Sequence, residues 1–172
     1  MVSDLKNLSA YNPDEIPSAK GYRFAIVCSD WNNEITNPLS VGCIKTLEKH
    51  GAKSSNIKVF HVPGSFELTF ACNELVKSKN FDAIIAVGCI IEGETRHFEF
   101  IASAVANGIT QLNALRSVPV IFGVLTPANQ QQAIERAGGK FGNKGIEAAI
   151  TAIKMIALKG SIRKKKFKIL EN

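Results

Sequence analysis

The fold is decided by the stretch Ala83-Ile84-Ile85-Ala86-Val87, an uninterrupted apolar run in the middle of the chain. Three other short runs resemble it, at residues 24–28, 57–62 and 118–122. All four are rich in Val and Ile and mostly continuous, which is typical of strands in a parallel sheet covered on both faces. The sequence therefore predicts four buried strands in a parallel sheet.

Between and after these strands, apolar residues recur at the spacing of helices. The pair Asn37-Pro38 is expected to start one helix, which Gly51 ends. The other predicted helices span residues 66–76, 97–115, 129–137 and 144–158. Strands that alternate with helices in this way favour an α/β sandwich built around a parallel sheet.

The chain shows no internal repeat and no linker that would divide it. Residues 1–160 are expected to form a single domain, in which residues 1–20 are an extended N-terminal arm. The composition, with 45% hydrophobic and 21% charged residues, is that of a globular domain. No stretch is apolar and long enough to cross a membrane, and the first residues do not resemble a signal peptide, so we expect a cytoplasmic protein.

The net charge of +6 is concentrated at the C-terminus. From Lys159 onwards there are six basic residues and one acidic residue, so this segment carries five of the six net positive charges. The pI of about 9.2 therefore reflects a basic C-terminal tail, residues 161–172, and not the folded domain. The tail has two interpretations, a solvated segment or a binding site for nucleic acid or anionic cargo, and the first is the simpler.

The four cysteines, Cys28, Cys43, Cys72 and Cys89, all lie in apolar stretches, and none belongs to a Cys-x-x-Cys pair. Buried, reduced thiols are the expected state. No Cys/His cluster has the spacing of a zinc site, so no metal is predicted.

Candidate site residues gather directly after the predicted strands, at residues 29–32, 63–67, 88–97 and 123–126. In open α/β sheets, ligands bind outside the carboxyl ends of the strands. The sequence therefore predicts a ligand site at this end of the sheet.

Four residues in these segments could have a chemical role, and for most of them a purely structural role is the alternative interpretation. Trp31, the only tryptophan, could stack on a flat heterocycle or anchor its loop. Glu67 could accept hydrogen bonds from sugar-like hydroxyls or complement a helix dipole. Thr95 and the N–H groups around it could bind an anion such as phosphate or cap a helix. His97, in the first turn of a predicted helix, is placed to exchange protons near neutral pH.

Residues 136–145 form the densest cluster of glycine and positive charge. Arg136 could hold a phosphate with two parallel hydrogen bonds, and Lys140 and Lys144 add charge. The glycines let the main chain approach a ligand. The spacing matches neither a Walker A loop nor a dinucleotide-binding fingerprint. The alternative interpretation is a flexible turn that joins two helices.

Three of these stretches, residues 64–67, 88–98 and 136–145, together resemble the lumazine synthase family, and their order and spacing agree from about Tyr22 to about Leu158. The resemblance implies a flavodoxin-like α/β fold, a three-layer sandwich with a four-stranded parallel sheet flanked by helices. It implies condensation of 5-amino-6-(D-ribitylamino)uracil with 3,4-dihydroxy-2-butanone 4-phosphate. The products would be 6,7-dimethyl-8-ribityllumazine, phosphate and water, in the penultimate step of riboflavin biosynthesis, with no cofactor or metal.

The resemblance also assigns roles to individual residues. Trp31 matches the aromatic residue that stacks on the pyrimidine, His97 the proton-transfer histidine, and Arg136 the phosphate-binding arginine. Ser65, Phe66 and Glu67 match residues that bind the ribityl chain, and Cys89, Ile90 and Ile91 match residues whose main chain contacts the ring. Glu94 and Thr95 match the segment on the phosphate side. Phe122 and Lys144 match positions that reach the pocket from a neighbouring subunit.

A site shared between subunits requires a homo-oligomer. The resemblance implies head-to-tail pentamers, and the compact turn at residues 138–145 favours their packing into a 60-subunit icosahedral shell, with riboflavin synthase as a partner that it could enclose. The N-terminal arm is expected to add as a strand to an adjacent subunit. Two rivals remain: a noncatalytic relative that binds flavin or lumazine or forms a shell, and a nucleic-acid-binding protein that uses the basic tail.

Overall fold

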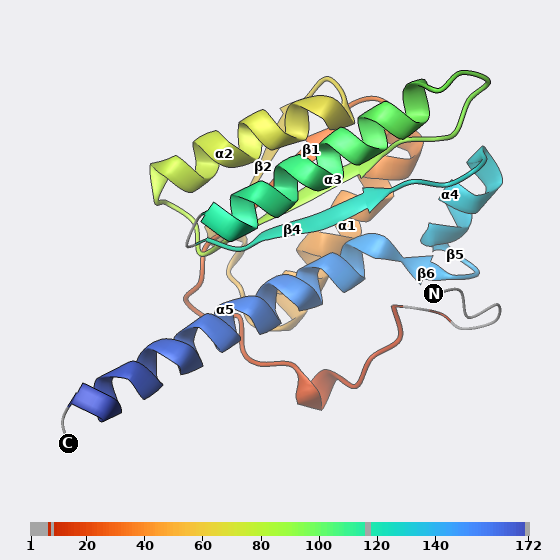
Figure 1. Ribbon diagram of the computed structural model, residues 1–172. Coiled ribbons are helices and arrows are strands. Elements are labelled where there is room, and N and C mark those ends of the chain that lie inside the picture. Colours follow the sequence, from red (N-terminus) through yellow and green to blue (C-terminus); the bar gives the residue numbers. More distant parts are fainter. Residues whose placement is uncertain (1–6, 8, 116–117, 171–172) are drawn as a thin grey trace.

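The fold is built on a four-stranded parallel sheet (Figure 1). The computed structural model describes residues 7, 9–115 and 118–170. The strands lie in the order β2-β1-β3-β4, and every neighbouring pair is parallel. Their bounds are β1 (Phe24–Ser29), β2 (Ile57–Val62), β3 (Ala83–Cys89) and β4 (Val120–Leu125).

Helices cover both faces of this sheet. α1 (Asn33–Lys49) and α5 (Lys144–Leu170) pack on one face, and α2 (Leu68–Ser78) and α3 (His97–Leu115) pack on the other (Figure 1). The short helix α4 (Gln130–Arg136) follows β4, and single 3₁₀ turns lie at η1 (Pro13–Glu15), η2 (Ser54–Asn56) and η3 (Ser65–Glu67). The predicted three-layer sandwich around a four-stranded parallel sheet is confirmed, but the predicted burial is wrong for β2, an edge strand whose residues 58–61 are exposed.

The central strand β1 shows why its sequence suits this position. Every residue of β1 is buried, because side chains leave a strand alternately towards its two faces. Phe24 and Ile26 pack into the core beneath α1 and α5, whereas Ala25 and Val27 pack into the core beneath α2 and α3. A continuous apolar run therefore serves two hydrophobic cores at once.

α1 begins at Asn33, so the predicted start at residues 37–38 is wrong. Pro38 lies inside the helix, where its ring interrupts the main-chain hydrogen bonds. Contacts with the sheet hold the turn before it, since the Thr36 hydroxyl is buried and donates a hydrogen bond to the carbonyl of Ser29 at 2.8 Å. Tertiary packing thus overrides the local signal of the proline.

β4 begins at Val120, two positions after the predicted start at residue 118. Pro119 has no N–H to give to a sheet. Asn113 of α3 then holds the first strand residue: its side-chain oxygen accepts from the N–H of Val120 at 2.9 Å, and its amide donates to the Val120 carbonyl at 2.8 Å. Phe122 consequently lies in the middle of the strand, and most of the segment 123–126 lies within the strand instead of after it.

The stretch between α4 and α5 is an ordered hairpin. β5 (Ala137–Gly139) pairs antiparallel with β6 (Gly142–Asn143). Gly138 and Gly142 have φ angles of 122° and 85°, a region that favours glycine. The alternative interpretation of residues 136–145 as a flexible turn is therefore wrong, because part of this stretch forms a β-hairpin.

α5 continues to Leu170, past its predicted end at Leu158, and takes in most of the segment expected as a tail. The added residues are rich in Lys and Arg, residue types with a high helix propensity. A domain boundary at residue 160 stays a prediction. Among the residues that the structure describes, no helix is both long and apolar enough to span a membrane.

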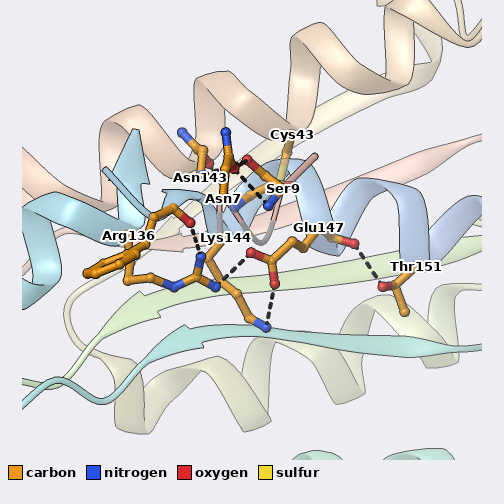
Figure 2. A network of polar contacts seen from close by, with 10 residues as sticks. Asn7, Ser9, Cys43, Arg136, Asn143, Lys144, Glu147 and Thr151 are labelled. Atoms are coloured by element: carbon orange, nitrogen blue, oxygen red, sulfur yellow. Dashed lines mark hydrogen bonds and ion pairs between the residues drawn. The ribbon is translucent and has the colours of Figure 1, made fainter. Parts of the chain in front are cut away.

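The described part of the N-terminal arm, residue 7 and residues 9–20, is mostly extended and contacts its own chain. The Tyr11 hydroxyl lies 3.1 Å from Nε2 of His50, and the N–H of Ala19 donates to the His50 carbonyl at 2.8 Å. Further towards the N-terminus, the Ser9 hydroxyl accepts a hydrogen bond from the N–H of Asn143 at 3.1 Å (Figure 2). Pairing of this arm with an adjacent subunit stays a prediction.

Candidate active site

The carboxyl ends of β1, β2 and β3 bring one set of predicted residues together, here called the strand-end group. Trp31 follows β1 and lies against Gly64, which follows β2. Glu67 turns back to the same glycine, and its Oε2 accepts a hydrogen bond from the Gly64 N–H at 3.0 Å. Asn32 joins β1 to β3, since its amide donates to the Cys89 carbonyl at 2.9 Å. The full group, defined by position after these three strands, is Trp31, Ser65, Phe66, Glu67, Cys89, Ile90, Ile91, Glu94, Thr95 and His97.

Two aromatic side chains of this group face solvent. Trp31 is 67% exposed and Phe66 is 55% exposed, although large apolar side chains are usually buried. Ser65 differs, because it is buried and its hydroxyl has no hydrogen-bond partner among the described residues. The close approach of Gly88 makes this burial possible, since a β-carbon there would lie 2.6 Å from the Ser65 oxygen. The group therefore offers open flat surfaces beside an unsatisfied hydroxyl.

Cys89 contributes to this group through its main chain. Burial raises the pKa of the Cys89 thiol to about 12, and the negative charge of Glu34 adds to this shift. A thiol with so high a pKa stays protonated at neutral pH and is a poor nucleophile. Ile90 and Ile91, which follow it, are half-buried, and the N–H of Ile90 is bound to the Leu125 carbonyl at 2.9 Å.

The segment before α3 is exposed and carries the predicted proton-transfer residue. α3 begins at His97, as predicted for its first turn, and the Thr95 hydroxyl accepts from the His97 N–H at 3.4 Å. Glu94, Thr95 and His97 are all exposed. Within the described part of the chain, the His97 imidazole has no hydrogen-bond partner, so both ring nitrogens are open to a ligand.

The remaining predicted residues, together with Glu147, form a second set beside the hairpin, here called the hairpin group. Figure 2 shows its residues Arg136, Lys144 and Glu147. Arg136, at the end of α4, donates to Glu147 at 2.6 Å and to the Phe141 carbonyl. Lys144, at the start of α5, donates to the other oxygen of Glu147 at 3.2 Å. Two cations thus share one carboxylate, which leaves one net positive charge. The group is Phe122, Arg136, Lys144 and Glu147.

A cavity of about 560 Å³ opens between α3, β4 and α5 beside the hairpin group. Phe122 and Lys144 line it, together with Glu147. Among the described residues, none of the strand-end group lines this cavity. The chain therefore presents its predicted site residues in two separate sets.

Sequence reasoning assigned no individual role to three residues that organise these sets. Glu147 holds both cations of the hairpin group, and its position three residues after Lys144 on a helix was the available signal. Asn32 and Asn143 act through their amides, and no spacing pattern distinguishes such an asparagine from a loop residue. Lys140, by contrast, is exposed, and its ammonium lies over the Phe141 ring at 5.1 Å. No three His, Cys, Asp or Glu side chains of the described residues cluster as metal ligands would.

The sheet order places the chain among α/β proteins with a parallel sheet covered by helices on both faces, a class in which ligands generally bind outside the carboxyl ends of the strands. Within that class the chain belongs to the 6,7-dimethyl-8-ribityllumazine synthase family, whose model matches residues 21–160. The resemblance carried by the three sequence stretches is thereby confirmed.

Several curated proteins with the name 6,7-dimethyl-8-ribityllumazine synthase are similar to this chain over nearly its full length. The protein of Phocaeicola vulgatus is 51% identical over 95% of this chain and 98% of its own length. That of Cytophaga hutchinsonii is 54% identical over 91% of this chain and 98% of its own length. That of Flavobacterium psychrophilum is 48% identical over 92% and 84%.

Proposed function

We propose that this protein is a transferase that makes 6,7-dimethyl-8-ribityllumazine, in the penultimate step of riboflavin biosynthesis. The substrates are 5-amino-6-(D-ribitylamino)uracil and 3,4-dihydroxy-2-butanone 4-phosphate, and phosphate and water are released. The observation that carries this proposal is the family match over residues 21–160, a range that includes both the strand-end group and the hairpin group. Relatives of the same name at about half identity support it.

The strand-end group suits the ribityl-aminouracil. The exposed ring of Trp31 can stack on the pyrimidine, since flat aromatic systems prefer such offset contacts. The ribityl chain carries several hydroxyls, and the carboxylate of Glu67 and the unpartnered hydroxyl of Ser65 are acceptors for them. Phe66 adds apolar surface, and the main chain after β3, at Cys89, Ile90 and Ile91, lies beside the ring.

The hairpin group and the segment before α3 suit the phosphate substrate. Arg136 retains guanidinium hydrogens beyond those bound to Glu147 and Phe141, and Lys144 brings a second cation. In the site between subunits proposed below, Thr95 and the main chain at Glu94 belong to the other subunit and contribute hydrogen-bond donors to the phosphate. Charge-assisted hydrogen bonds of this kind are the strong ones for phosphate.

The chemistry requires proton transfer more than it requires a nucleophile on the protein. An amine attacks the ketone and water leaves to give an imine; phosphate then departs, and a second condensation closes the ring. The open imidazole of His97 can move protons in these steps. Holding two substrates together supplies much of the remaining acceleration.

The separation of the two groups supports a site completed by a second subunit. Lys144 and Arg136 share Glu147, so Arg136 is grouped with Lys144 and Phe122 as the contribution of the neighbouring chain. We propose a closed head-to-tail pentamer for this reason, with an icosahedral shell and an enclosed riboflavin synthase as further steps of the same proposal. A cytoplasmic location also stays a prediction.

The decisive experiment mixes the purified protein with both substrates and follows lumazine absorbance and fluorescence against an enzyme-free blank. The proposal expects acceleration that falls strongly in Arg136→Ala, because the phosphate loses its main anchor. Lys20→Ala, an exposed residue of the arm, is the matched control and should keep full activity. No acceleration by a folded wild-type protein would overturn the enzymatic proposal and favour a noncatalytic lumazine-binding relative.

A further inference from the structure

We propose that Asn143 is a positioning residue that sets the distance and direction of Arg136 and Lys144 for binding phosphate. This inference rests on the proposed function for the identity of the phosphate substrate. It rests on the structure alone for the link between Asn143 and the two cations.

Asn143 is buried, at 9% exposure, and both polar atoms of its side chain form hydrogen bonds. Figure 2 shows it between Ser9 and the hairpin group. Its amide donates to the Pro38 carbonyl at 3.0 Å and to the Ala137 carbonyl at 3.3 Å. Its side-chain oxygen accepts from the N–H of Gly145 at 2.8 Å. One side chain thus joins three separate pieces of main chain.

These three attachment points bracket the cations. Ala137 directly follows Arg136, and Gly145 directly follows Lys144. The Asn143 amide therefore fixes the main chain one residue away from each cation, and it ties both to the carbonyl of Pro38 in α1. Because α1 packs into the core, these bonds fix the positions of the two cations relative to the core of the domain.

α1 is shaped to receive this asparagine. A β-carbon at Gly42 would lie 2.6 Å from the Asn143 side-chain oxygen, so only glycine leaves room there. A β-carbon at Gly145 would collide with the main chain of Leu39, so α5 begins in direct contact with α1. Cys43 adds a contact of its thiol with the Gly145 carbonyl at 3.1 Å. The fit is close on both sides of the asparagine.

The hairpin needs such an attachment because its glycine-rich sequence has high conformational freedom. It contains Gly138, Gly139 and Gly142, and glycine loses more conformational freedom on ordering than any other residue. Glu147 joins the two cations to each other, but it contacts only the ends of long side chains. The Asn143 bonds instead reach the main chain, so they determine where the side chains start.

The test compares Asn143→Ala with wild type in the assembled, full-length protein. Binding of inorganic phosphate is measured by calorimetry, and KM is measured for each substrate separately. We expect phosphate affinity to fall about tenfold, with a similar rise in KM for the butanone phosphate, as for the loss of roughly one well-placed hydrogen bond. KM for the aminouracil should stay within about twofold, because the strand-end group is untouched.

A matched control separates positioning from general stability. Asn56→Ala also removes a partly buried amide that donates to a main-chain carbonyl, that of Tyr22 at 3.3 Å, but it does so near the start of β2. This variant should lose stability without any change in phosphate affinity. Equal phosphate affinity in wild type and a folded Asn143→Ala would overturn the proposal, as would an equal loss in Asn56→Ala.

Gly42→Ala keeps the test decisive if Asn143→Ala does not fold. The added methyl group displaces the Asn143 side chain, while alanine itself favours the helix. We expect the same loss of phosphate affinity, and unchanged affinity in a folded Gly42→Ala would overturn the proposal. A wild type without synthase activity whose phosphate binding still depends on Asn143 would contradict the proposed function and support this inference. A wild type that shows neither activity nor phosphate binding would overturn both.

Discussion

The indole ring of Trp31 lies so close to Gly64 that a β-carbon at position 64 would come within 2.7 Å of the ring carbon Cε3. The same glycine donates its N–H to Glu67, so one residue without a side chain sets the position of two proposed contacts to the aminouracil. A loop residue with ordinary backbone angles therefore has a steric role at the site.

Gly64→Ala should push the indole away from its present position, because the ring cannot overlap the added methyl group. We expect KM for the aminouracil to rise about tenfold, as for the loss of one aromatic stacking contact, with little change for the phosphate substrate. Since Trp31 is the only tryptophan, its fluorescence emission reports the displacement directly. Gly160→Ala, where a β-carbon would meet nothing within 4 Å, is the matched control. An unchanged emission spectrum in Gly64→Ala would contradict the steric argument.

Glu147→Gln should strengthen phosphate binding. The substitution keeps the shape of the side chain but removes the carboxylate that offsets one of the two cations Arg136 and Lys144. Inorganic phosphate should bind roughly tenfold more tightly, and product phosphate should inhibit more strongly. Calorimetry measures the phosphate affinity and inhibition assays measure product inhibition, each at low and high salt because salt screens the charges. Glu74→Gln, which loses an exposed pair with Lys77, is the control and should change neither quantity.

His97→Ala should slow turnover without abolishing it. Proton transfer by a positioned side chain contributes about a hundredfold or more, but orientation of the two substrates persists without it. Single-turnover measurements should show a lower rate constant with little change in KM. His61→Ala, whose imidazole lies 2.8 Å from Asp30 on an exposed surface, is the histidine control. Complete loss of activity in an assembled His97→Ala variant would sink this account of the mechanism.

The stability of the protein should fall at alkaline pH through its buried thiols. Burial raises the pKa of Cys72 to about 12, whereas a cysteine in an unfolded chain ionises near pH ~8.5. The stabilising contribution is therefore complete below pH ~8.5 and declines as the pH rises towards the folded value, by about 2 kcal/mol at pH 10. Urea unfolding at pH 7.5 and 10 measures this change. Cys72→Ala should show a smaller difference between the two pH values than wild type.

The N-terminal arm should loosen in mild acid. Burial lowers the pKa of His50, and the neighbouring positive charge of Lys49 lowers it further. A depressed histidine pKa favours the neutral form in the folded state, so its contribution is present above pH ~6.5 and is lost as the pH falls. Hydrogen exchange of residues 9–20, corrected for intrinsic rates, should be faster at pH 5 than at pH 7.5. His50→Gln should remove this difference, and a difference that persists would argue against His50 as its source.

The fold was predictable because its strands and most of its helices follow simple periodicities. The apolar run at residues 83–87 is β3 with its two last residues missing, and residues 97–115 are α3 with the same bounds. The errors arose where a hydrogen bond to the neighbouring element, seven positions away along the chain, decided the outcome. Thr36 holds the turn before Pro38, and Asn113 fixes the start of β4. Neither contact is visible in the local sequence.

The candidate site was predictable by residue type but not by arrangement. Trp31, Glu67 and His97 could be proposed because each follows a strand at the carboxyl edge of the sheet. The pairing of Arg136 with Glu147 could not, because it depends on how α5 packs against the end of α4. The amide of Asn143 is similarly invisible, since its three partners lie up to 105 positions away in the chain.

The hydrogen bond between Ser9 and Asn143 joins residues 134 positions apart. During synthesis on the ribosome, the arm emerges first and must wait for the hairpin, which is made only after the whole sheet. Contacts of such long separation form late in folding, because the chain between them must already be ordered. The phosphate end of the site is therefore expected to mature late, and a chain that stalls before the hairpin lacks both the cations and α5, the helix that packs beside α1 on one face of the sheet.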